Sequence, residues 1–160
     1  RMPNHRSFWW MTEGEWQFNG EPVSEDMLNK YYGFCYLITN LENGRKYIGR
    51  KYFWSVRRWK KTDKRRKRKE SDWRNYWSSS KLVQEAVKLK GERKFVREIL
   101  VFCKTKGDLN RIETYLLWKH NVLENDEFYN DSIGNMKGAP QHIVEDRLFA
   151  NNEVLKCKIL

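Results

Sequence analysis

The sequence has little that would cross-link the chain covalently or anchor it in a membrane. Only three cysteines occur among its 160 residues, and none belongs to a Cys-x-x-Cys pair. Cysteines that are odd in number and widely spaced argue against a disulfide framework and against structural zinc. No apolar run approaches the roughly 20 residues that a bilayer crossing requires. Residues 1–10 also lack the apolar centre of a signal peptide. We therefore expect no membrane partner and a protein that works in a cytoplasm.

Hydrophobic residues make up 39% of the chain and charged residues 33%. This balance is typical of a globular protein with a modest core, and the length suits one well-packed domain. Cys35 and Cys103 stand inside apolar runs, so we interpret them as small core residues.

Positive charge is concentrated in one short segment. Residues 57–69 contain ten Lys or Arg and one Asp, so this segment carries +9 of the net charge of +11. Such a segment cannot bury apolar surface, and we expect a solvated loop or the fraying extension of a helix. Its charge density favours contact with a phosphate backbone. A localisation signal or a merely solubilising loop remains an alternative.

The pattern of apolar residues predicts alternating strands and helices. Two β-favouring runs around the turn signal Asn43-Gly44 indicate a hairpin of strands 33–39 and 45–49. Later segments predict a helix over 81–90, capped within Ser78–Ser80 and ended by Gly91, then a strand over 95–103. We also expect a helix over 109–120 with Asp108 as its cap, and helical structure over 51–61. Residues 1–30 read as an irregular lead-in that packs some aromatics, and residues from 128 as loop. The order predicts a small α+β domain, a three-stranded antiparallel sheet flanked by helices.

Two tyrosines on the predicted hairpin carry a resemblance. The tripeptides Phe34-Cys35-Tyr36 and Tyr47-Ile48-Gly49 resemble the paired signature of the GIY-YIG nucleases, the second literally and the first only at Tyr36. An arginine ten positions after the second tyrosine (Arg57), a glutamate on a later helix (Glu113) and a loop asparagine (Asn130) follow in the family's order. The stretches TNLENGRKYIGRKYF, ESDWRNYWSSSK and FVREIL are similar to those of small phage-type members.

The resemblance covers about residues 32–133 and implies the GIY-YIG nuclease fold. We accordingly divide the chain into an aromatic and polar extension (1–30), a nuclease domain (31–133) with a basic arm (57–69), and a C-terminal tail (134–160). The implied activity is metal-dependent hydrolysis of DNA phosphodiester bonds, in the host cytoplasm if the protein is phage-encoded.

The tyrosines have two readings. Tyr36 and Tyr47 suit simple packing in a sheet, but alternation along the strands also allows their phenols to converge across the hairpin. The resemblance implies that Tyr47 is the general base for the attacking water, with Tyr36 beside it. Many relatives carry a histidine shortly after the arginine; here Lys60, Lys61 and Thr62 occupy that zone. The remaining histidines fit no metal spacing.

Glu113 falls within the apolar stripe of its helix, between Leu109 and Leu117. A carboxylate facing a core is costly unless it is paired, so either a divalent cation or a buried partner such as Arg111 or Lys119 must offset the cost. The resemblance implies a metal at Glu113, and Mg²⁺ suits a single carboxylate completed by waters and phosphate, with Mn²⁺ as a substitute.

The remaining candidates concern the phosphate and the DNA. Arg57 or Arg58 is the expected clamp on the scissile phosphate; each also fits a surface arginine that touches DNA without catalysing. Asn130 fits either an ordinary turn residue or the family's site-organising asparagine. The expected DNA contacts, on double-stranded DNA, are Lys51, Lys60, Lys61, Lys64, Arg65, Arg66, Lys67, Arg68, Lys69 and Arg74.

Two other classes of protein compete with the nuclease. One is a non-catalytic nucleic-acid-binding module on a GIY-YIG-like fold, which the altered Phe34-Cys35 half of the motif favours. The other is a structural or interaction protein whose aromatic N-terminal segment docks a partner, which leaves the placement of Glu113 unexplained. For the nuclease, one such site cuts one strand, so a double-strand break requires a homodimer on DNA or two visits.

Overall fold

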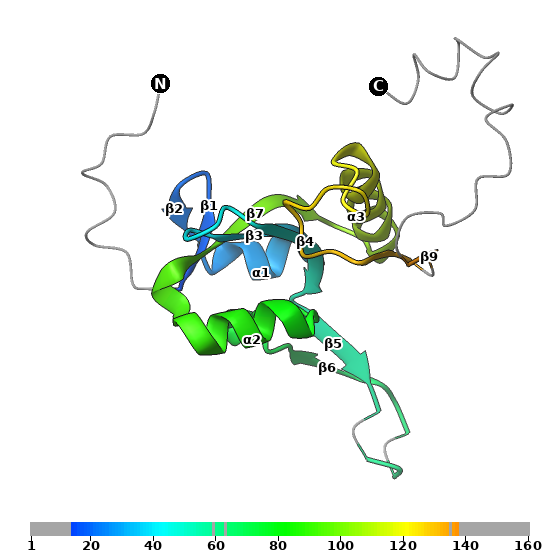
Figure 1. The fold of residues 1–160 in the computed structure, drawn as a ribbon. Helices are drawn as coiled ribbons and strands as arrows, with labels where there is room; N and C mark the ends of the chain where they lie inside the picture. The colour runs from blue at the N-terminus through cyan, green and yellow to red at the C-terminus, as the bar shows by residue number, and fades with distance from the viewer. Residues whose placement is uncertain (1–13, 59, 63, 135, 138–160) are drawn as a thin grey trace, which may run out of the picture.

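A five-stranded sheet forms the centre of the fold. The computed structural model describes residues 14–58, 60–62, 64–134 and 136–137 (Figure 1). The strand order is β2-β1-β7-β3-β4, with β1 at Trp16–Phe18, β2 at Glu21–Pro22, β3 at Gly33–Asn40, β4 at Lys46–Tyr52 and β7 at Phe95–Cys103. The α+β class is confirmed. The prediction of three strands is wrong, because two short N-terminal strands extend the sheet.

The central hairpin forms as the sequence predicts. In the register of β3 and β4, Tyr36 faces Gly49 and Ile38 faces Tyr47. The turn between them contains Gly44 at a φ of 71°, a conformation that glycine adopts without strain. Strand β7 pairs antiparallel with the other side of β3, so β4 has a neighbouring sheet strand on one side only.

The N-terminal segment is more regular than expected. Strand β1 pairs parallel with β7, and the turn Asn19-Gly20 returns the chain into β2. Both turn residues have positive φ (52° and 80°), as a tight type I′ turn requires. A short helix, α1 (Asp26–Lys30), follows. A strand of three residues has too short an alternation of polar and apolar side chains to be recognised from the sequence alone. The predicted packing of N-terminal aromatics is confirmed for Trp16, which is buried.

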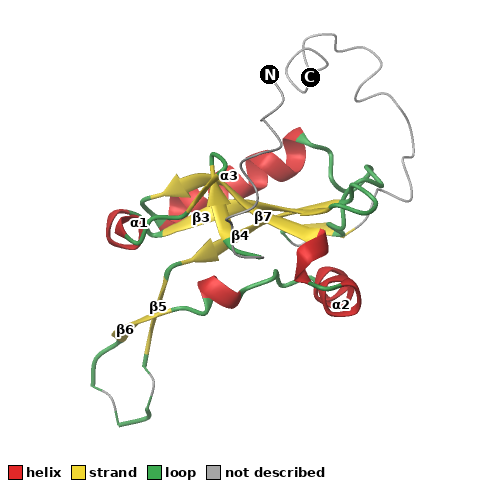
Figure 2. Ribbon diagram, turned by 90° about the vertical axis from the view of Figure 1, so that its left-hand side faces the viewer, coloured by secondary structure: helices red, strands yellow, loops and turns green. Residues whose placement is uncertain are grey.

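Two longer helices cover opposite faces of the sheet (Figures 1 and 2). Helix α2 (Lys81–Lys90) begins after Ser80, whose hydroxyl accepts from the Val83 N–H, and ends at Gly91, as predicted. Helix α3 (Lys106–Lys119) starts three residues earlier than predicted. Its cap is the Thr105 hydroxyl rather than Asp108; Asp108 accepts from that hydroxyl within the first turn. Short 3₁₀ turns lie at Trp73–Asn75 and Glu92–Lys94.

The segment predicted as a helix over 51–61 is instead extended. Strand β4 runs to Tyr52, and strand β5 (Trp54–Arg57) pairs antiparallel with β6 (Lys67–Glu70). The basic arm is therefore the distal part of a β-hairpin that projects from the body of the protein (Figure 1), and the expectation of a helix extension is wrong. Strand β6 carries only charged residues and offers no apolar alternation, so its pairing could not be read from the pattern.

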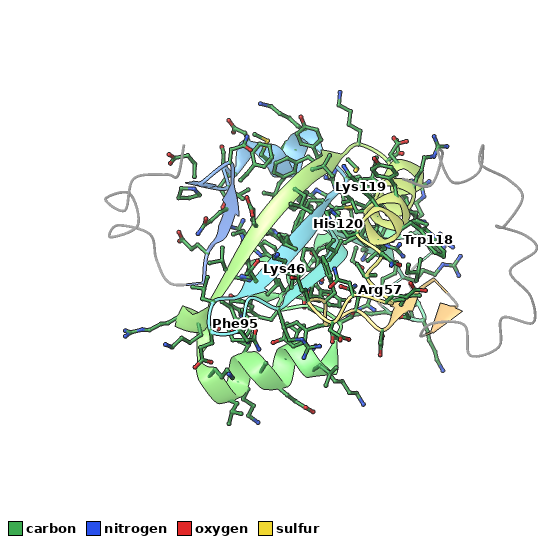
Figure 3. All side chains as sticks on the ribbon, turned by 45° about the horizontal axis from the view of Figure 1, so that its top comes forward. Lys46, Arg57, Phe95, Trp118, Lys119 and His120 are labelled. Atoms are coloured by element: carbon green, nitrogen blue, oxygen red, sulfur yellow. The ribbon has the colours of Figure 1, made fainter. Side chains whose placement is uncertain are left out.

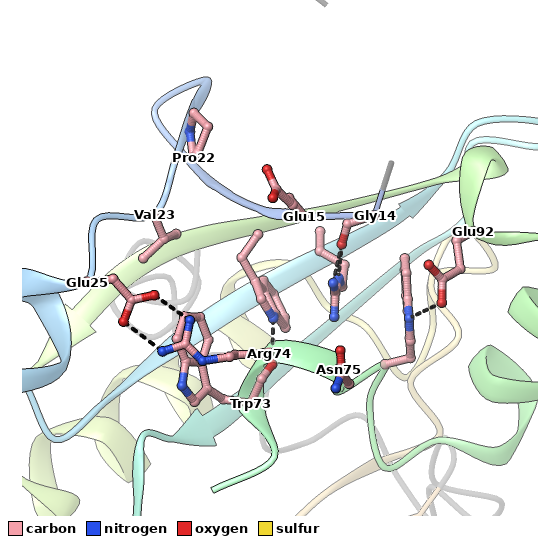
Figure 4. Close-up of a pocket in the computed structure, with 12 residues that line it drawn as sticks. Gly14, Glu15, Pro22, Val23, Glu25, Trp73, Arg74, Asn75 and Glu92 are labelled. Carbon is pink, nitrogen blue, oxygen red and sulfur yellow. Dashed lines mark hydrogen bonds and ion pairs between the residues drawn. The ribbon is translucent and has the colours of Figure 1, made fainter. Parts of the chain in front are cut away.

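A buried arginine connects the N-terminal segment to the sheet. Arg97, on β7, is 5% exposed and donates to the carbonyls of Gly14 and Tyr76. Its guanidinium also lies over the rings of Trp16 and Trp77, at 4.7 and 4.2 Å from the ring centroids. Burial lowers the pKa of Arg97 to about 10. Gly14, Trp16, Trp77 and Arg97 line a hollow of about 370 Å³ at this end of the sheet (Figure 4).

The chain after α3 returns along the free edge of β4. The Lys46 N–H donates to the Glu127 carbonyl, and the Tyr129 N–H donates to the Lys46 carbonyl. Two-residue strands, β8 (Ser132–Ile133) and β9 (Met136–Lys137), follow, in agreement with the expected loop-like structure. Most of the predicted tail, 134–160, lies outside the described residues. Within the described part of the chain, no helix combines the length and apolarity needed to cross a membrane.

Aromatic rings fill the core between the sheet and α2. Phe34 is fully buried at its centre, with ring centroids 5.0 Å from those of both Trp16 and Phe53. The large ring that replaces the family's glycine in the first tripeptide is therefore a packing residue, which fills space among other aromatics.

Substitution of Phe34 tests this packing role. We expect Phe34→Ala to lower the free energy of unfolding by about 3–5 kcal/mol, because it removes a fully buried ring and leaves a cavity. Urea denaturation followed by tryptophan fluorescence measures the change. The control is Trp118→Ala, at an aromatic that is 53% exposed, with an expected change below about 0.5 kcal/mol. Equal losses in the two variants would contradict the assignment.

Candidate functional site

Three of the predicted site residues meet at the free edge of β4. A hollow of about 510 Å³ lies there, and Tyr47, Glu113 and Asn130 all line it. The chain reaches it from β4, from α3, from the start of α2 and from the segment after residue 127. Its other lining residues are Ile48, Arg50, Ser79, Ser80, Lys81, Leu82, Thr114, Leu117, Asp131, Ser132 and Gly134.

The two tyrosines converge on the face of the sheet that α2 covers. Their ring centroids are 6.2 Å apart, so the predicted convergence is confirmed. Gly49 makes room for this arrangement, since a Cβ at that position would lie 2.5 Å from the Tyr36 hydroxyl oxygen. Tyr36 is 1% exposed. Tyr47 is half-buried and lines the hollow, where its hydroxyl lies 3.4 Å from Ser79 Oγ.

Burial fixes the protonation state of Tyr36. Desolvation raises the pKa of its phenol well above the ordinary value, and the nearby phenols of Tyr76 and Tyr47 raise it further. Tyr36 therefore stays neutral at physiological pH and lies too deep to meet a substrate. Of the two tyrosines, Tyr47 has the exposure that a reacting group needs.

Glu113 approaches the hollow from the opposite face of the sheet. It lies on α3 between Leu109 and Leu117, which are 0% and 3% exposed, and its own side chain is 19% exposed. Desolvation raises the pKa of this carboxyl, while the neighbouring Arg50 guanidinium lowers it in part. The predicted placement of a carboxylate within the apolar stripe is thus confirmed.

The partner of Glu113 is a residue that sequence reasoning missed. Arg50 Nη1 lies 3.1 Å from Glu113 Oε2, whereas the expected partners were Arg111 and Lys119. The alternation of side chains along β4 could have indicated this partner. Arg50 is three residues after Tyr47, so its side chain points to the opposite face of the strand, which α3 covers. Arg50 is 37% exposed and also lines the hollow, so its guanidinium is accessible to an anion.

One carboxylate oxygen of Glu113, Oε2, combines burial with a single ion pair. It lies 3.1 Å from Arg50 Nη1, and among the described residues no donor is aligned to form a hydrogen bond with it. No group of three or more His, Cys, Asp or Glu that could hold a metal occurs in the described ranges. The donor set therefore fits a hard cation that takes one carboxylate here and completes its coordination with waters and phosphate oxygens, as Mg²⁺ commonly does.

Asn130 holds the backbone of β4. Its side-chain oxygen accepts from the Ile48 N–H at 3.0 Å, and its side-chain nitrogen donates to the Ile48 carbonyl at 2.8 Å. The side-chain amide thus makes with Ile48, between Tyr47 and Gly49, the two hydrogen bonds that the backbone of a neighbouring strand would make. Asn130 does more than an ordinary turn residue, because it fixes the strand that carries both Tyr47 and Arg50.

Arg57 and Arg58 are not among the residues that line this hollow. Arg57 ends β5 and lines a second hollow, of about 570 Å³, together with Lys51 and Lys69. Arg57, labelled in Figure 3, and the following Arg58 are both exposed. Their assignment to the scissile phosphate stays a prediction from spacing.

Most of the expected DNA-binding residues lie on the projecting hairpin. The side chains of Lys60, Lys61, Lys64, Arg65, Arg66, Lys67, Arg68 and Lys69 are exposed. Two others already have partners on the body of the protein. Lys51 pairs with Asp72 at 2.5 Å and lies 3.7 Å above the Tyr76 ring, and Arg74 pairs with Glu25 and Glu70.

The chemistry of the hollow follows from its three functional groups. A phenol, a guanidinium and the carboxylate that is ion-paired with this guanidinium surround one concave site at the edge of a sheet. A guanidinium binds a phosphate through its planar fork, a carboxylate binds a divalent cation, and a phenol can exchange a proton with water. Together the three groups can hold and polarise a phosphodiester.

Comparison with known proteins agrees with this geometry. Residues 16–133 match the family model described as "Putative endonuclease segE, GIY-YIG domain". No curated protein and no solved structure matches the chain.

Removal of the Asn130 amide tests its role at the edge of β4. We expect Asn130→Ala to lower the free energy of unfolding by about 1–3 kcal/mol, because it leaves the N–H and carbonyl of Ile48 without partners. Thermal and urea unfolding measure the loss. Asn125→Ala is the control, since Asn125 accepts one exposed hydrogen bond from the Glu127 N–H and its loss should cost clearly less. If both substitutions cost the same, Asn130 has no special role in the fold.

Proposed function

Because the chain belongs to the SegE GIY-YIG family of endonuclease domains, we propose that it is an enzyme that hydrolyses phosphodiester bonds of double-stranded DNA with a divalent cation. The observation that carries the proposal is the meeting of Tyr47, Arg50 and Glu113 at one hollow. A protein that only binds DNA has no need of a half-buried carboxylate beside the phosphate site.

In the proposed reaction, Tyr47 first gives its phenolic proton to solvent, and its phenolate oxygen then removes a proton from a water molecule aligned with the phosphorus atom. The water oxygen forms the new P–O bond while the bond to the 3′ oxygen of the leaving strand breaks. Ser79, whose hydroxyl lies 3.4 Å from that of Tyr47, helps to orient the phenol. Tyr36 is a positioning residue, since its ring lies beside Tyr47 and against Gly49.

Glu113 is the proposed ligand of the cation, which is Mg²⁺ or, as a substitute, Mn²⁺. Nucleases of this family generally use divalent metal ions. The buried Glu113 Oε2, which has an ion pair with Arg50 but no aligned hydrogen bond, supports this role. A cation bound there would supply a Lewis acid that stabilises the departing 3′ oxygen. With a single carboxylate, Glu113 would hold the cation weakly until a phosphate arrives.

Arg50 is our proposed clamp on the scissile phosphate. Its guanidinium lies 3.1 Å from Glu113 Oε2 and is partly exposed in the hollow, so it can move from the carboxylate to a phosphate oxygen with little rearrangement. Arg57 and Arg58 are the competing candidates, supported by their spacing from Tyr47. Their position on the hairpin also suits a contact with the backbone beside the cut.

The hairpin is proposed to supply affinity for DNA. Its exposed Lys and Arg side chains carry most of the net positive charge of the chain and would release counterions from a duplex on binding. Lys51 and Arg74 would add to this surface from the body of the protein. A double-strand break would need two active sites, supplied by a homodimer or by two successive visits.

Incubation of the purified protein with supercoiled plasmid and Mg²⁺ tests the proposal. We expect nicking that EDTA abolishes and that Glu113→Gln reduces by at least about 100-fold, as typical of losing a transition-state contact. Glu85→Gln, at an exposed carboxylate on α2, is the control and should retain full activity. Tight binding without cleavage in Mg²⁺ and Mn²⁺ would replace the nuclease by a binding module. Cleavage that survives Glu113→Gln would refute the proposed ligand.

A second experiment separates the arginines. We expect Arg50→Ala to lower kcat by about 100-fold, because it removes charge stabilisation from the transition state. Arg57→Ala and Arg58→Ala should mainly raise KM for plasmid. Single-turnover and steady-state rates measure the two effects. A large fall in kcat for Arg57→Ala or Arg58→Ala with Arg50→Ala unaffected would return the clamp to the hairpin.

A further inference from the structure

The hairpin of β5 and β6 has two chemically different faces. In its register, Ser55 pairs with Lys69 and Arg57 pairs with Lys67, while Trp54 and Val56 pair with the other two residues of β6. Since side chains alternate along a strand, two sets separate. The cationic face consists of Ser55, Arg57, Lys67 and Lys69. The opposite, mixed face consists of Trp54, Val56, Arg68 and Glu70.

The mixed face is engaged within the protein. Arg68 lies 3.8 Å above the ring of Trp54, and the Trp54 Nε1–H donates to the Leu28 carbonyl at 2.9 Å. Glu70 accepts from the Trp73 Nε1–H and from Arg74. These contacts fix the base of the hairpin on the body of the protein, so the orientation of the two faces is set by the fold.

Three residues of the cationic face share a hollow with β4. Ser55, Arg57 and Lys69 line the hollow of about 570 Å³ together with Lys51, and Trp54 and Glu70 at the base of the mixed face also reach it. Lys51 directly follows Arg50, which lines the hollow of Tyr47 and Glu113. The two hollows therefore adjoin along β4.

The spacing of the charges matches that of a nucleic-acid backbone. Residues two apart on a strand, such as Lys67 and Lys69, are separated by about 6.8 Å. Successive phosphates on one strand of duplex DNA rise by about 3.4 Å along the helix axis, and they lie further apart in space because the backbone winds around that axis. Two lysines on one face can thus contact neighbouring phosphates of the same strand.

We propose that the cationic face of the hairpin binds the phosphate backbone of duplex DNA immediately beside the bond that is cut. The mixed face supports the hairpin and takes no part in this contact. The inference rests on the proposed function, because it assigns DNA as the substrate, and it goes further by dividing adjacent basic residues into binding and supporting ones. Arg68 carries the same charge as Lys67 and Lys69 but occupies the opposite face, where it packs on Trp54.

Binding measurements on adjacent residues test the inference. The dissociation constant of the full chain for a 30-base-pair duplex (about three helical turns) is measured by fluorescence anisotropy in EDTA, over a range of salt concentrations. We expect Lys67→Ala and Lys69→Ala each to weaken binding by about 3- to 10-fold and to reduce the salt slope by about 1. Arg68→Gln should change the affinity by less than about twofold and leave the slope unchanged.

The outcomes are separable from those of the cleavage assay. If Arg68→Gln weakens binding as much as Lys67→Ala and Lys69→Ala do, the charges of the hairpin contribute regardless of the face that they occupy, and the inference is wrong. Absence of duplex binding would overturn it as well. A face-dependent loss in a protein that never cleaves would sustain the division of the hairpin into a binding and a supporting face, while the nuclease proposal and the location beside a cut bond fail. Because Arg68 packs on Trp54, circular dichroism of each variant verifies that the hairpin is retained, and Arg68→Met provides a second substitution that keeps the apolar stem.

Discussion

The free edge of β4 is the constraint on which the site depends. An edge strand exposes backbone N–H and carbonyl groups that must find partners or water. Here the returning chain satisfies them at Lys46 through backbone bonds and at Ile48 through the side chain of Asn130. The backbone N–H and carbonyl groups of alternate residues point to the same side of a strand, so after Lys46 and Ile48 the next residue whose backbone groups face this edge is Arg50. Here the guanidinium of Arg50 is paired with Glu113, and both residues line the hollow at the edge.

The same edge separates two environments. Tyr47 comes from the face that α2 covers, and Arg50 and Glu113 come from the face that α3 covers. In the middle of a sheet, the backbone separates side chains on one face from side chains on the other face. Because β4 is the last strand of the sheet, side chains from both of its faces can reach one hollow at its edge. Burial then distinguishes the two tyrosines, since Tyr36 is 1% exposed and Tyr47 is only half-buried and lines the hollow.

The sequence contained most of the scaffold. Strong periodicity predicted the central hairpin, α2 and β7, and Glu113 was found because its place in an apolar stripe violates an expected pattern. The failures concern elements whose pairing partner is distant or uninformative. Strand β6 is wholly charged, β1 has three residues, and both are stabilised by tertiary pairing rather than by local preference. Arg50 was missed because spacing from Tyr47 directed attention to Arg57, whereas its contact with Glu113 depends on how α3 crosses β4.

The buried Arg97 has a consequence for dissecting the protein. Its guanidinium receives carbonyl partners from both sides, Gly14 before β1 and Tyr76 before α2. A fragment that begins at Trp16 would keep every residue of β1, but the buried guanidinium of Arg97 would lose the Gly14 carbonyl as a hydrogen-bond acceptor. Such a cation must recruit water or leave its place between Trp16 and Trp77. A fragment that keeps the surroundings of Arg97 intact must therefore include Gly14, which lies before the first strand.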